Sequence, residues 1–236
     1  MPNSSCPLCS AKQVSFFQQD VRRSYYQCQQ CMLVFADRAS LLSATEELAQ
    51  YQLHQNDLQD LGYRRFLQRL AGPLLANLPS ANLSGLDFGC GPGPLLARML
   101  SEAGHSMALW DPYFAAEPAV LQRQYDFISC SEAIEHFVNP GQEWALWLQL
   151  LKPGATLAIM TKRYTSAAAF ANWHYKLDPT HVSFFSAQTF AYLAERDGFF
   201  LFGMRVLRDE LHTVGFRGDI RCNGADILAG HAFVEH

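Results

Sequence analysis

Four cysteines near the start of the chain are spaced like the ligands of a metal ion. They form two pairs, Cys6 with Cys9 and Cys28 with Cys31, and 18 residues separate the pairs. Two thiolates three positions apart on a tight turn present both sulfurs to one ion, and two such turns complete a tetrahedral, closed structural zinc site. The spacing therefore predicts structural zinc, with two disulfides or unrelated free thiols as the alternatives.

Glycines at alternate positions follow a short apolar run and precede a helical pattern. Gly89, Gly91 and Gly93 allow positive φ and close approach of a ligand, and a helix start adds free N–H groups. Asp87, just before them, would repel a pyrophosphate but could pair with an ammonium group. Asp111 follows Gly89 by 22 residues, where a carboxylate can accept hydrogen bonds from both ribose hydroxyls. S-adenosylmethionine, which has a ribose, an amino-acid group and no phosphate, fits this set.

Three histidines lie where open α/β sheets bind ligands. His136 follows one predicted strand, and His174 and His181 lie in a long aromatic and polar stretch after the next. Imidazole titrates near neutral pH, so each is a candidate general base for the acceptor of a methyl group. The alternatives are histidines that only bond to backbone carbonyls, and a divalent ion held by Glu132, Glu135 and His136.

The segments that must position these residues alternate between strand and helix patterns. Compact apolar runs predict strands over 83–88, 106–110, 127–131, 155–161, 199–207 and 227–234. Helical spacing and capping residues predict helices over 94–103, from 139 to a stop at 152–154, and over 186–197. This alternation predicts an α/β fold with a doubly wound, mostly parallel sheet.

The first 80 residues carry different patterns. Two short strand patterns lie between the cysteine pairs, and Ser43 with Glu46 forms a capping box that begins a short helix. A second helix is predicted from about residue 56, kinked or divided at Gly72-Pro73. The expected units are a cysteine module at 1–38, a helical linker that covers the cofactor at 39–80, and the α/β domain at 81–236.

Composition excludes several classes of function. Of 236 residues, 49% are apolar and 17% are charged, which favours a packed core over disorder. The net charge of −4 provides no general basic field for nucleic acid. No apolar run approaches the roughly 20 residues of a membrane span, and the N-terminus lacks a signal-peptide pattern. We therefore expect a soluble, cytoplasmic protein.

The motifs, taken in order, resemble those of the class I S-adenosylmethionine-dependent methyltransferases. The resemblance covers roughly residues 51–236 and rests on the glycine motif at 87–93, Asp111, and the segments 125–137 and 150–155. The Glu-x-x-Glu-His sequence at 132–136 looks like the branch that holds the ubiquinone-pathway O-methyltransferases. The cysteine module resembles a zinc ribbon, which several small-molecule and sugar methyltransferases of that broad group also carry.

This resemblance implies a seven-stranded type of sheet and a role for individual residues. The three glycines would line the methionine portion of the cofactor, Asp111 would hold the ribose, and Ser131 and Glu132 would lie near the sulfonium. The cofactor-binding residues expected are Asp87, Gly89, Cys90, Gly91, Gly93, Asp111, Ser131 and Glu132.

One segment departs from the family pattern. Only 14 residues, 112–125, lie between Asp111 and Asp126, too few for a helix, an edge strand and two loops. We predict that the helix is lost and that the edge strand is shortened to about 119–121 or absent. The adenine contact that normally follows this strand is then altered.

Three functions remain open from the sequence. The first is methyl transfer to a small-molecule acceptor, such as a hydroxylated ring or sugar, by in-line displacement. The second is RNA methylation with the zinc ribbon as RNA contact, favoured by a net charge of +2 within residues 1–40 from four basic and two acidic residues. The third is a cofactor-binding module without catalysis. The oligomeric state is left open.

Overall fold

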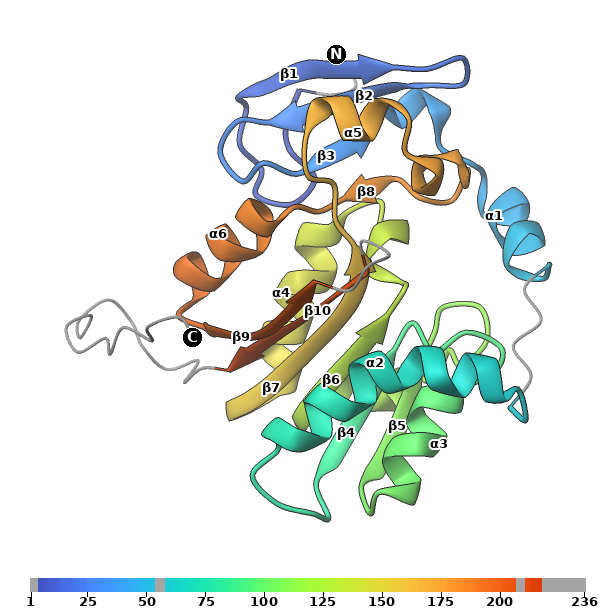
Figure 1. The fold of residues 1–236 in the computed structure, drawn as a ribbon, viewed down its shortest axis with the longest axis vertical. Helices are drawn as coiled ribbons and strands as arrows, with labels where there is room; N and C mark the ends of the chain where they lie inside the picture. The colour runs from blue at the N-terminus through green and yellow to red at the C-terminus, as the bar shows by residue number, and fades with distance from the viewer. Residues whose placement is uncertain (1–3, 54–57, 207–210, 218–236) are drawn as a thin grey trace.

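The computed structural model describes residues 4–53, 58–206 and 211–217 of the 236-residue chain. Its central element is a six-stranded sheet in the order β5-β4-β6-β7-β10-β9. Strands β5, β4, β6 and β7 are parallel, and β10 runs antiparallel to both of its neighbours (Figure 1). The bounds are Ser84–Phe88 (β4), Ser106–Trp110 (β5), Tyr125–Ser131 (β6), Leu151–Lys162 (β7), Phe200–Val206 (β9) and Leu211–Arg217 (β10).

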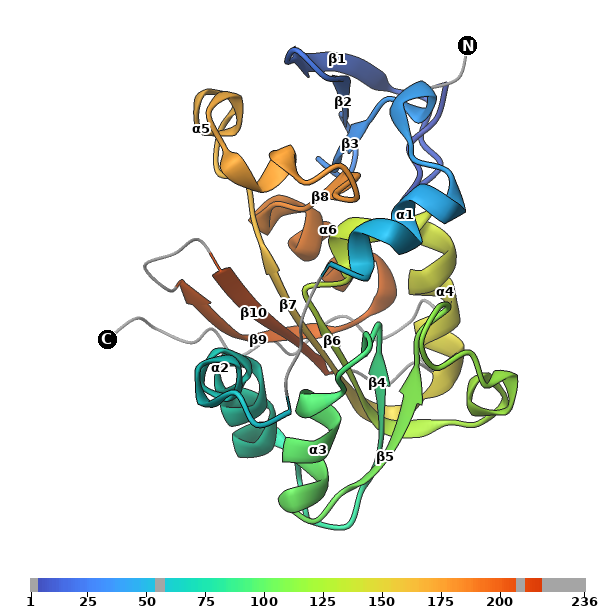
Figure 2. The same ribbon diagram turned by 90° about the vertical axis from the view of Figure 1, so that its right-hand side faces the viewer.

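Helices cover both faces of this sheet, as the predicted α/β fold requires. Figure 2 shows α2 and α3 on one side of the sheet and α4 on the other. Successive residues of β7 alternate between the two cores: Leu157 and Ile159 pack with α4, whereas Ala158 and Met160 pack with α2 and α3. The helix bounds are Leu61–Asn77 (α2), Leu95–Glu102 (α3), Pro140–Leu150 (α4) and Ala187–Asp197 (α6).

Most of the predicted elements of this domain are present. The capping of α6 is as expected: Ser186 and Thr189 form a capping box, the rings of Phe185 and Phe190 stack 5.2 Å apart, and Gly198 ends the helix at φ +72°. The last strand was predicted at 227–234, which lies outside the described residues. The strand that pairs with β7 and β9 is instead Leu211–Arg217, for which we predicted no element.

The second helix begins later than predicted and is not divided. It begins at Leu61 with Asp60 as N-cap, because the Asp60 carboxylate accepts the N–H of Gly62 at 2.6 Å. It also runs undivided past Pro73, with Leu70 and Leu74 buried on the same face. Packing of this apolar face on the sheet outweighs the backbone hydrogen bond that proline removes.

The short segment after β5 confirms the predicted loss of a helix. Residues 112–124 contain no α-helix and no strand, and a 3₁₀ turn at Pro118–Gln122 takes the place of the expected edge strand. Strand β5 is therefore the edge of the sheet, beside which Asp111 forms only an isolated bridge with Ala115.

The cysteine-containing segment folds as a second, antiparallel sheet above the carboxyl ends of the parallel strands (Figure 1). Its order is β1-β2-β3-β8, so the last strand comes from a distant part of the chain. The predicted capping box of Ser43 and Glu46 is present at the start of α1. The bounds are Val14–Gln19 (β1), Ser24–Cys28 (β2), Val34–Ala36 (β3), Ala44–Tyr51 (α1), Ala167–Ala171 (α5) and Ser183–Phe184 (β8). Among the described helices, none combines the length and the apolar character needed to cross a membrane.

Candidate active site

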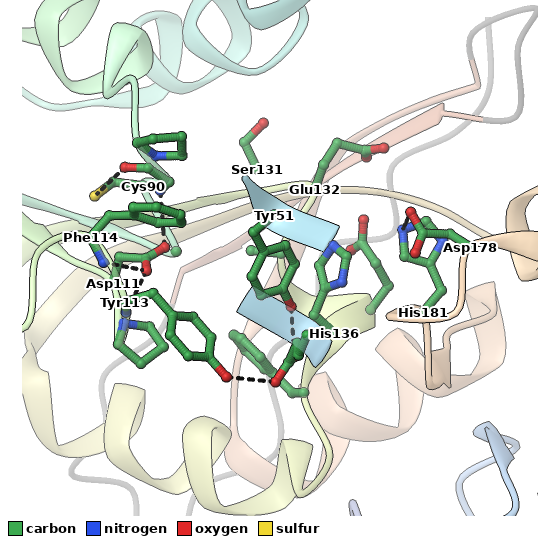
Figure 3. Close-up of a pocket in the computed structure, with 18 of the residues that line it drawn as sticks. Tyr51, Cys90, Asp111, Tyr113, Phe114, Ser131, Glu132, His136, Asp178 and His181 are labelled. Atoms are coloured by element: carbon green, nitrogen blue, oxygen red, sulfur yellow. Dashed lines mark hydrogen bonds and ion pairs between the residues drawn. The ribbon is translucent and has the colours of Figure 1, made fainter. Parts of the chain in front are cut away.

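A cavity of about 540 Å³ lies at the carboxyl edge of the parallel strands. It is bounded by the loops after β4, β5 and β6, by α1 and the start of α2, and by the segment that precedes β8 (Figure 3). Open α/β sheets bind ligands at this edge. Of the residues predicted as sites, those that line the cavity are Gly89, Cys90, Gly91, Asp111, Ser131, Glu132, His136 and His181.

The glycine turn forms one wall of the cavity. Gly89 and Gly91 have φ of +77° and +63°, values that disfavour any side chain. A Cβ on Gly89 would also lie 2.5 Å from the Cβ of Ala133. Cys90 lines the cavity between them, and burial raises the pKa of its thiol to about 12, so it is a neutral wall residue. The backbone of this turn can therefore approach a ligand closely.

Asp111 is fixed at the end of β5 by backbone N–H groups. One carboxylate oxygen accepts from Gly91 at 3.0 Å, and the other accepts from Tyr113 at 2.9 Å and Phe114 at 3.1 Å. These bonds tie the carboxylate to the glycine turn and leave the oxygen that Gly91 contacts with room for a further donor. The sequence predicted hydrogen bonds from both ribose hydroxyls, whereas this open position suits a bond from one of them.

Asp87 lies behind the glycine turn. It is buried, accepts a hydrogen bond from the Ser129 hydroxyl at 2.8 Å, and is not a lining residue of the cavity. Burial raises the pKa of Asp87 to about 6, and the Ser129 hydroxyl partly offsets this rise. Gly93 also lies outside the cavity lining. Direct pairing of Asp87 with a ligand ammonium is therefore not what this geometry favours; Asp87 braces β4 against β6.

The end of β6 places Glu132 at the centre of the cavity wall. Its φ of +48° is unusual for a residue with a side chain, and its N–H donates to Met160 at 2.7 Å. One carboxyl oxygen, Oε1, is buried without a hydrogen-bond partner, and the other lies 3.4 Å from the hydroxyl oxygen of Tyr175. Burial and then the nearby Glu135 raise the pKa of Glu132 well above its ordinary value. The unpaired oxygen indicates a polar ligand group at this point.

His136 and His181 lie on the opposite side of the cavity. Their rings contact each other edge to face, with centroids 4.7 Å apart (Figure 3). The Nδ1–H of His136 donates to the carbonyl of Thr180 at 3.2 Å, and the Nδ1–H of His181 donates to that of Tyr175 at 2.7 Å. Because carbonyls only accept, the neutral form of each ring carries its proton on Nδ1, which leaves Nε2 unprotonated. Burial lowers the pKa of His136, so its ring is neutral near pH 7.

Glu135 and Tyr175 lie next to the two imidazoles. The buried Glu135 carboxylate accepts from Thr161 at 3.0 Å and from the hydroxyl of Tyr175. Possible ligand atoms of Glu135, His136 and His181 lie within 4.8 Å of one another. The divalent-ion alternative would thus involve His181, which was not among its predicted ligands.

The third predicted base lies elsewhere. His174 is exposed at the start of a 3₁₀ turn, its Nε2 is 3.1 Å from the Lys162 ammonium, and it is not a lining residue of the cavity. The structure therefore brings together two of the three predicted bases.

Several cavity residues were not found from the sequence. Asp178 lines the cavity with an oxygen 3.9 Å from Nε2 of His181; burial opposes its charge, but hydrogen bonds from Thr180 and the nearby His181 hold its pKa below the ordinary value. Glu47 of α1 accepts from the hydroxyls of both Tyr51 and Tyr113 at 2.7 Å, which fastens α1 across the cavity mouth. In the sequence, only the Asp-Pro-Thr-His order at 178–181 could have suggested a role for Asp178. No local sequence pattern indicates that Glu47 contacts Tyr113.

The four cysteines of the N-terminal module meet at one point. Sγ of Cys6 is 3.5 Å from that of Cys31, and Sγ of Cys9 is 3.5 Å from that of Cys28. All four sulfurs lie within 4.8 Å of one another, and the four are free thiols. A tetrahedral site with Zn–S bonds of about 2.3 Å has sulfurs about 3.8 Å apart. Backbone N–H groups of Leu8 and Gln30 also point at Cys6 and Cys28, each at 3.4 Å.

Comparison with known proteins shows which family the chain resembles. The family described as "Methyltransferase domain" matches residues 55–201. A 1,6-didemethyltoxoflavin-N1-methyltransferase of Burkholderia thailandensis, solved with its substrate and S-adenosylhomocysteine, is 16% identical, has a TM-score of 0.51, and is matched over 87% of this chain and 99% of its own. A magnesium protoporphyrin IX methyltransferase of Synechocystis with bound S-adenosylhomocysteine is 14% identical, has a TM-score of 0.48, and is matched over 75% and 95%. Among curated proteins, no sequence matches the chain.

Proposed function

The chain belongs to the methyltransferase domain family, and we propose that it transfers the methyl group of S-adenosylmethionine to a small-molecule acceptor. The observation that carries this proposal is that a single cavity is lined by two different groups of residues. Asp111 and the glycine turn at one end suit a nucleoside, and a pair of carbonyl-anchored imidazoles stands at the other.

The cofactor would lie along the ends of β4, β5 and β6. Asp111 would accept from one ribose hydroxyl, the turn at Gly89 and Gly91 would contact the methionine portion, and Glu132 would meet a polar group with its unpaired Oε1. Bound there, S-adenosylmethionine supplies an activated methyl group on a positively charged sulfur. The carboxylates of this wall favour a positively charged ligand.

We assign proton removal to His181. Its Nδ1–H is held by the Tyr175 carbonyl, so Nε2 can accept the proton of an acceptor hydroxyl or amine as the acceptor attacks the methyl carbon. Asp178, 3.9 Å from Nε2, favours the imidazolium that results. His136, kept neutral by burial, has its own Nε2 available to orient the acceptor. Alignment of donor and acceptor supplies the rest of the acceleration.

The charge of the cavity supports a neutral or cationic acceptor. Within the described ranges, no lysine or arginine lines the cavity, whereas six acids do: Glu47, Asp111, Glu132, Glu135, Glu143 and Asp178. Such a wall repels the phosphates of RNA.

Three of the four basic residues that suggested RNA are engaged within the protein, and the fourth, Lys12, is exposed. Arg23 is buried, Arg22 donates to the carbonyl of Leu177 at 2.7 Å, and Arg38 donates to Asn139 at 2.9 Å. RNA methylation is left without a specific supporting observation. The Glu-x-x-Glu-His sequence alone favours an O-methyltransferase of the ubiquinone-pathway type within the small-molecule class.

The N-terminal module fits a structural zinc ion. Four sulfurs at tetrahedral spacing, with N–H groups aimed at two of them, are the donor set of a closed zinc site, and we propose that Cys6, Cys9, Cys28 and Cys31 hold it. With all four positions filled by sulfur, the ion stabilises the fold of the module and takes no part in methyl transfer. The division at 1–38, 39–80 and 81–236 is part of this proposal.

The test is transfer of a radiolabelled methyl group from S-adenosylmethionine to fractions of a cell extract, with and without ribonuclease. The proposal predicts label in a small-molecule fraction that ribonuclease does not remove. Label that ribonuclease removes would make the protein an RNA methyltransferase. Binding of S-adenosylhomocysteine with no transfer to any fraction would favour a module without catalysis.

A further inference from the structure

The segment of residues 174–181 carries the groups that fix both imidazoles, yet it has little regular structure of its own. It contains one 3₁₀ turn, His174–Leu177, and then a loop to β8. Its carbonyls at Tyr175 and Thr180 accept from His181 and His136. Something outside the segment must therefore hold these carbonyls in place.

Arg23, at the turn between β1 and β2, supplies that support. Its buried guanidinium donates to the carbonyls of Lys176 at 2.8 Å, Asp178 at 2.9 Å and Pro179 at 3.1 Å. Its Nε donates to the hydroxyl of Tyr25 at 3.0 Å. Along the chain, the three carbonyls that Arg23 holds lie between the two that anchor the imidazoles. A planar guanidinium is suited to fix several acceptors at once, which a lysine is not.

Two further residues of the same turn reach the segment. Asp20 accepts from the buried Lys176 ammonium at 2.7 Å, and it also accepts the N–H groups of Arg22 and Arg23. Arg22 donates to the carbonyl of Leu177 at 2.7 Å. An unpaired buried ammonium group would be unfavourable, and the Asp20 carboxylate neutralises that of Lys176. The turn and the segment are therefore joined by an ion pair as well as by hydrogen bonds from arginine to backbone carbonyls.

The sheet of the module continues into the same region. Strand β3 pairs with β8, and the N–H of Ala36 donates to the carbonyl of Val182 at 2.9 Å. Val182 in turn donates its N–H to the carbonyl of Glu135, at 2.9 Å. The loop that carries His136 and the segment that carries His181 are therefore both attached to the cysteine module (Figure 1).

We propose that Arg23 and Asp20 are positioning residues for the acceptor side of the methyltransferase site. Through them the zinc module holds residues 174–181 in the one arrangement that presents both imidazole Nε2 atoms to the cavity. The inference rests on the proposed function for its meaning, but the hydrogen-bond pattern can be tested without an acceptor. The contacts of the cofactor wall, on the loops after β4 and β5, are independent of this support.

The test uses nitrogen NMR of the zinc-loaded full chain labelled with ¹⁵N-histidine. In the wild type, His136 and His181 should each give the shifts of a single tautomer protonated at Nδ1. In Arg23→Gln these two signals should move toward the average of two tautomers, whereas Arg23→Lys should retain part of the wild-type pattern. Lys12→Gln, which removes one exposed charge from the same module, should leave both signals unchanged. Calorimetry should give the same affinity for S-adenosylhomocysteine in all four proteins.

Three results would overturn the inference: wild-type imidazole signals in Arg23→Gln, an equal change in Lys12→Gln, or loss of S-adenosylhomocysteine binding in Arg23→Gln together with the tautomer change, which would indicate general unfolding. If Arg23→Gln does not fold, Arg23→Lys gives the same reading with a smaller change. Failure of the wild type to bind S-adenosylhomocysteine contradicts the proposed function instead, and leaves the tautomer comparison as it stands.

Discussion

The two walls of the cavity are built in opposite ways. The cofactor wall comes from consecutive loops of one sheet: Gly89 and Gly91 follow β4, Asp111 follows β5, and backbone N–H groups hold the carboxylate. The acceptor wall, which consists of His136, His181 and the segment 174–181, joins distant parts of the chain. Arg23, which supports it, contacts carbonyls more than 150 positions away. Backbone geometry thus provides the shared chemistry, and long-range side-chain contacts provide whatever is particular to the acceptor.

This difference separates two kinds of sensitivity. A change in the cofactor wall should alter affinity for S-adenosylhomocysteine, whereas a change in the acceptor wall or in the module should alter turnover. The predictions on single residues below use turnover, affinity or both, with an acceptor identified by the labelling experiment.

The largest expected effect follows removal of the proposed zinc ion. Cys6, Cys28 and Cys31 belong to the same buried cluster as Trp144 of α4, so loss of the ion disturbs the core of the whole acceptor side. Structural zinc contributes several kcal/mol or more, so the melting temperature should fall by roughly 10 °C or more. Thermal scans before and after chelation measure it, with zinc restoring the value and magnesium not. An unchanged melting temperature would mean that the ion does not stabilise the core that the module shares with the acceptor wall.

Replacing the assigned base should give the next largest effect. His181→Gln keeps a polar side chain but removes the group that accepts the proton, so kcat should fall by about 10²- to 10⁴-fold. Calorimetry should show unchanged affinity for S-adenosylhomocysteine.

The matched control for this prediction is the exposed imidazole at position 174. His174→Gln should retain wild-type turnover, because this ring does not reach the cavity. A fall in His174→Gln equal to that in His181→Gln would move the acceptor wall to the outer side of the 174–181 segment.

The cofactor wall should show the converse pattern. Asp111→Ala removes a hydrogen bond from a ribose hydroxyl to a buried charged group, worth about 3 kcal/mol, so affinity for S-adenosylhomocysteine should fall by about 100-fold. Glu195→Ala, an exposed acid on α6, is the control and should bind as the wild type. Turnover at saturating cofactor should change far less. An unaltered affinity in Asp111→Ala would remove the central contact of this wall.

The smallest expected effect is on the acid limb of the pH profile. Burial dominates the lowered pKa of His136, with His181 acting the same way and Glu135 and Asp178 opposing it. The ring is thus neutral above its depressed pKa and becomes charged only below the ordinary value of about 6.5. Turnover profiles of the wild type and His136→Gln should keep the same shape above pH 6.5 and diverge only below it. Divergence centred above pH 7 would mean that His136 is charged in the working enzyme.

The sequence predicted the cofactor wall better than the acceptor wall, for a physical reason. The glycine turn, Asp111 and the capping of α6 depend on residues near one another in the chain, and their positions follow from strand ends and helix starts. The loss of the helix after Asp111 followed from length alone. The start of α2 was misplaced because no strong local signal separates residue 56 from Asp60.

The acceptor wall depends on contacts that no local pattern encodes. His136 and His181 were found because imidazole is a rare and reactive type, but His174 looked the same in sequence and lies outside the cavity. Asp178 and the role of Arg23 depend on the docking of the cysteine module. Likewise β10 was missed, since its pairing with β7 joins segments about 50 residues apart.

The most direct test of the central claim is calorimetric titration of the full chain with S-adenosylhomocysteine. The account predicts one-to-one binding by the wild type, the same affinity in His181→Gln and Arg23→Gln, and about 100-fold weaker binding in Asp111→Ala. No heat with S-adenosylhomocysteine, together with clear binding of a nicotinamide dinucleotide or a nucleoside triphosphate, would contradict it.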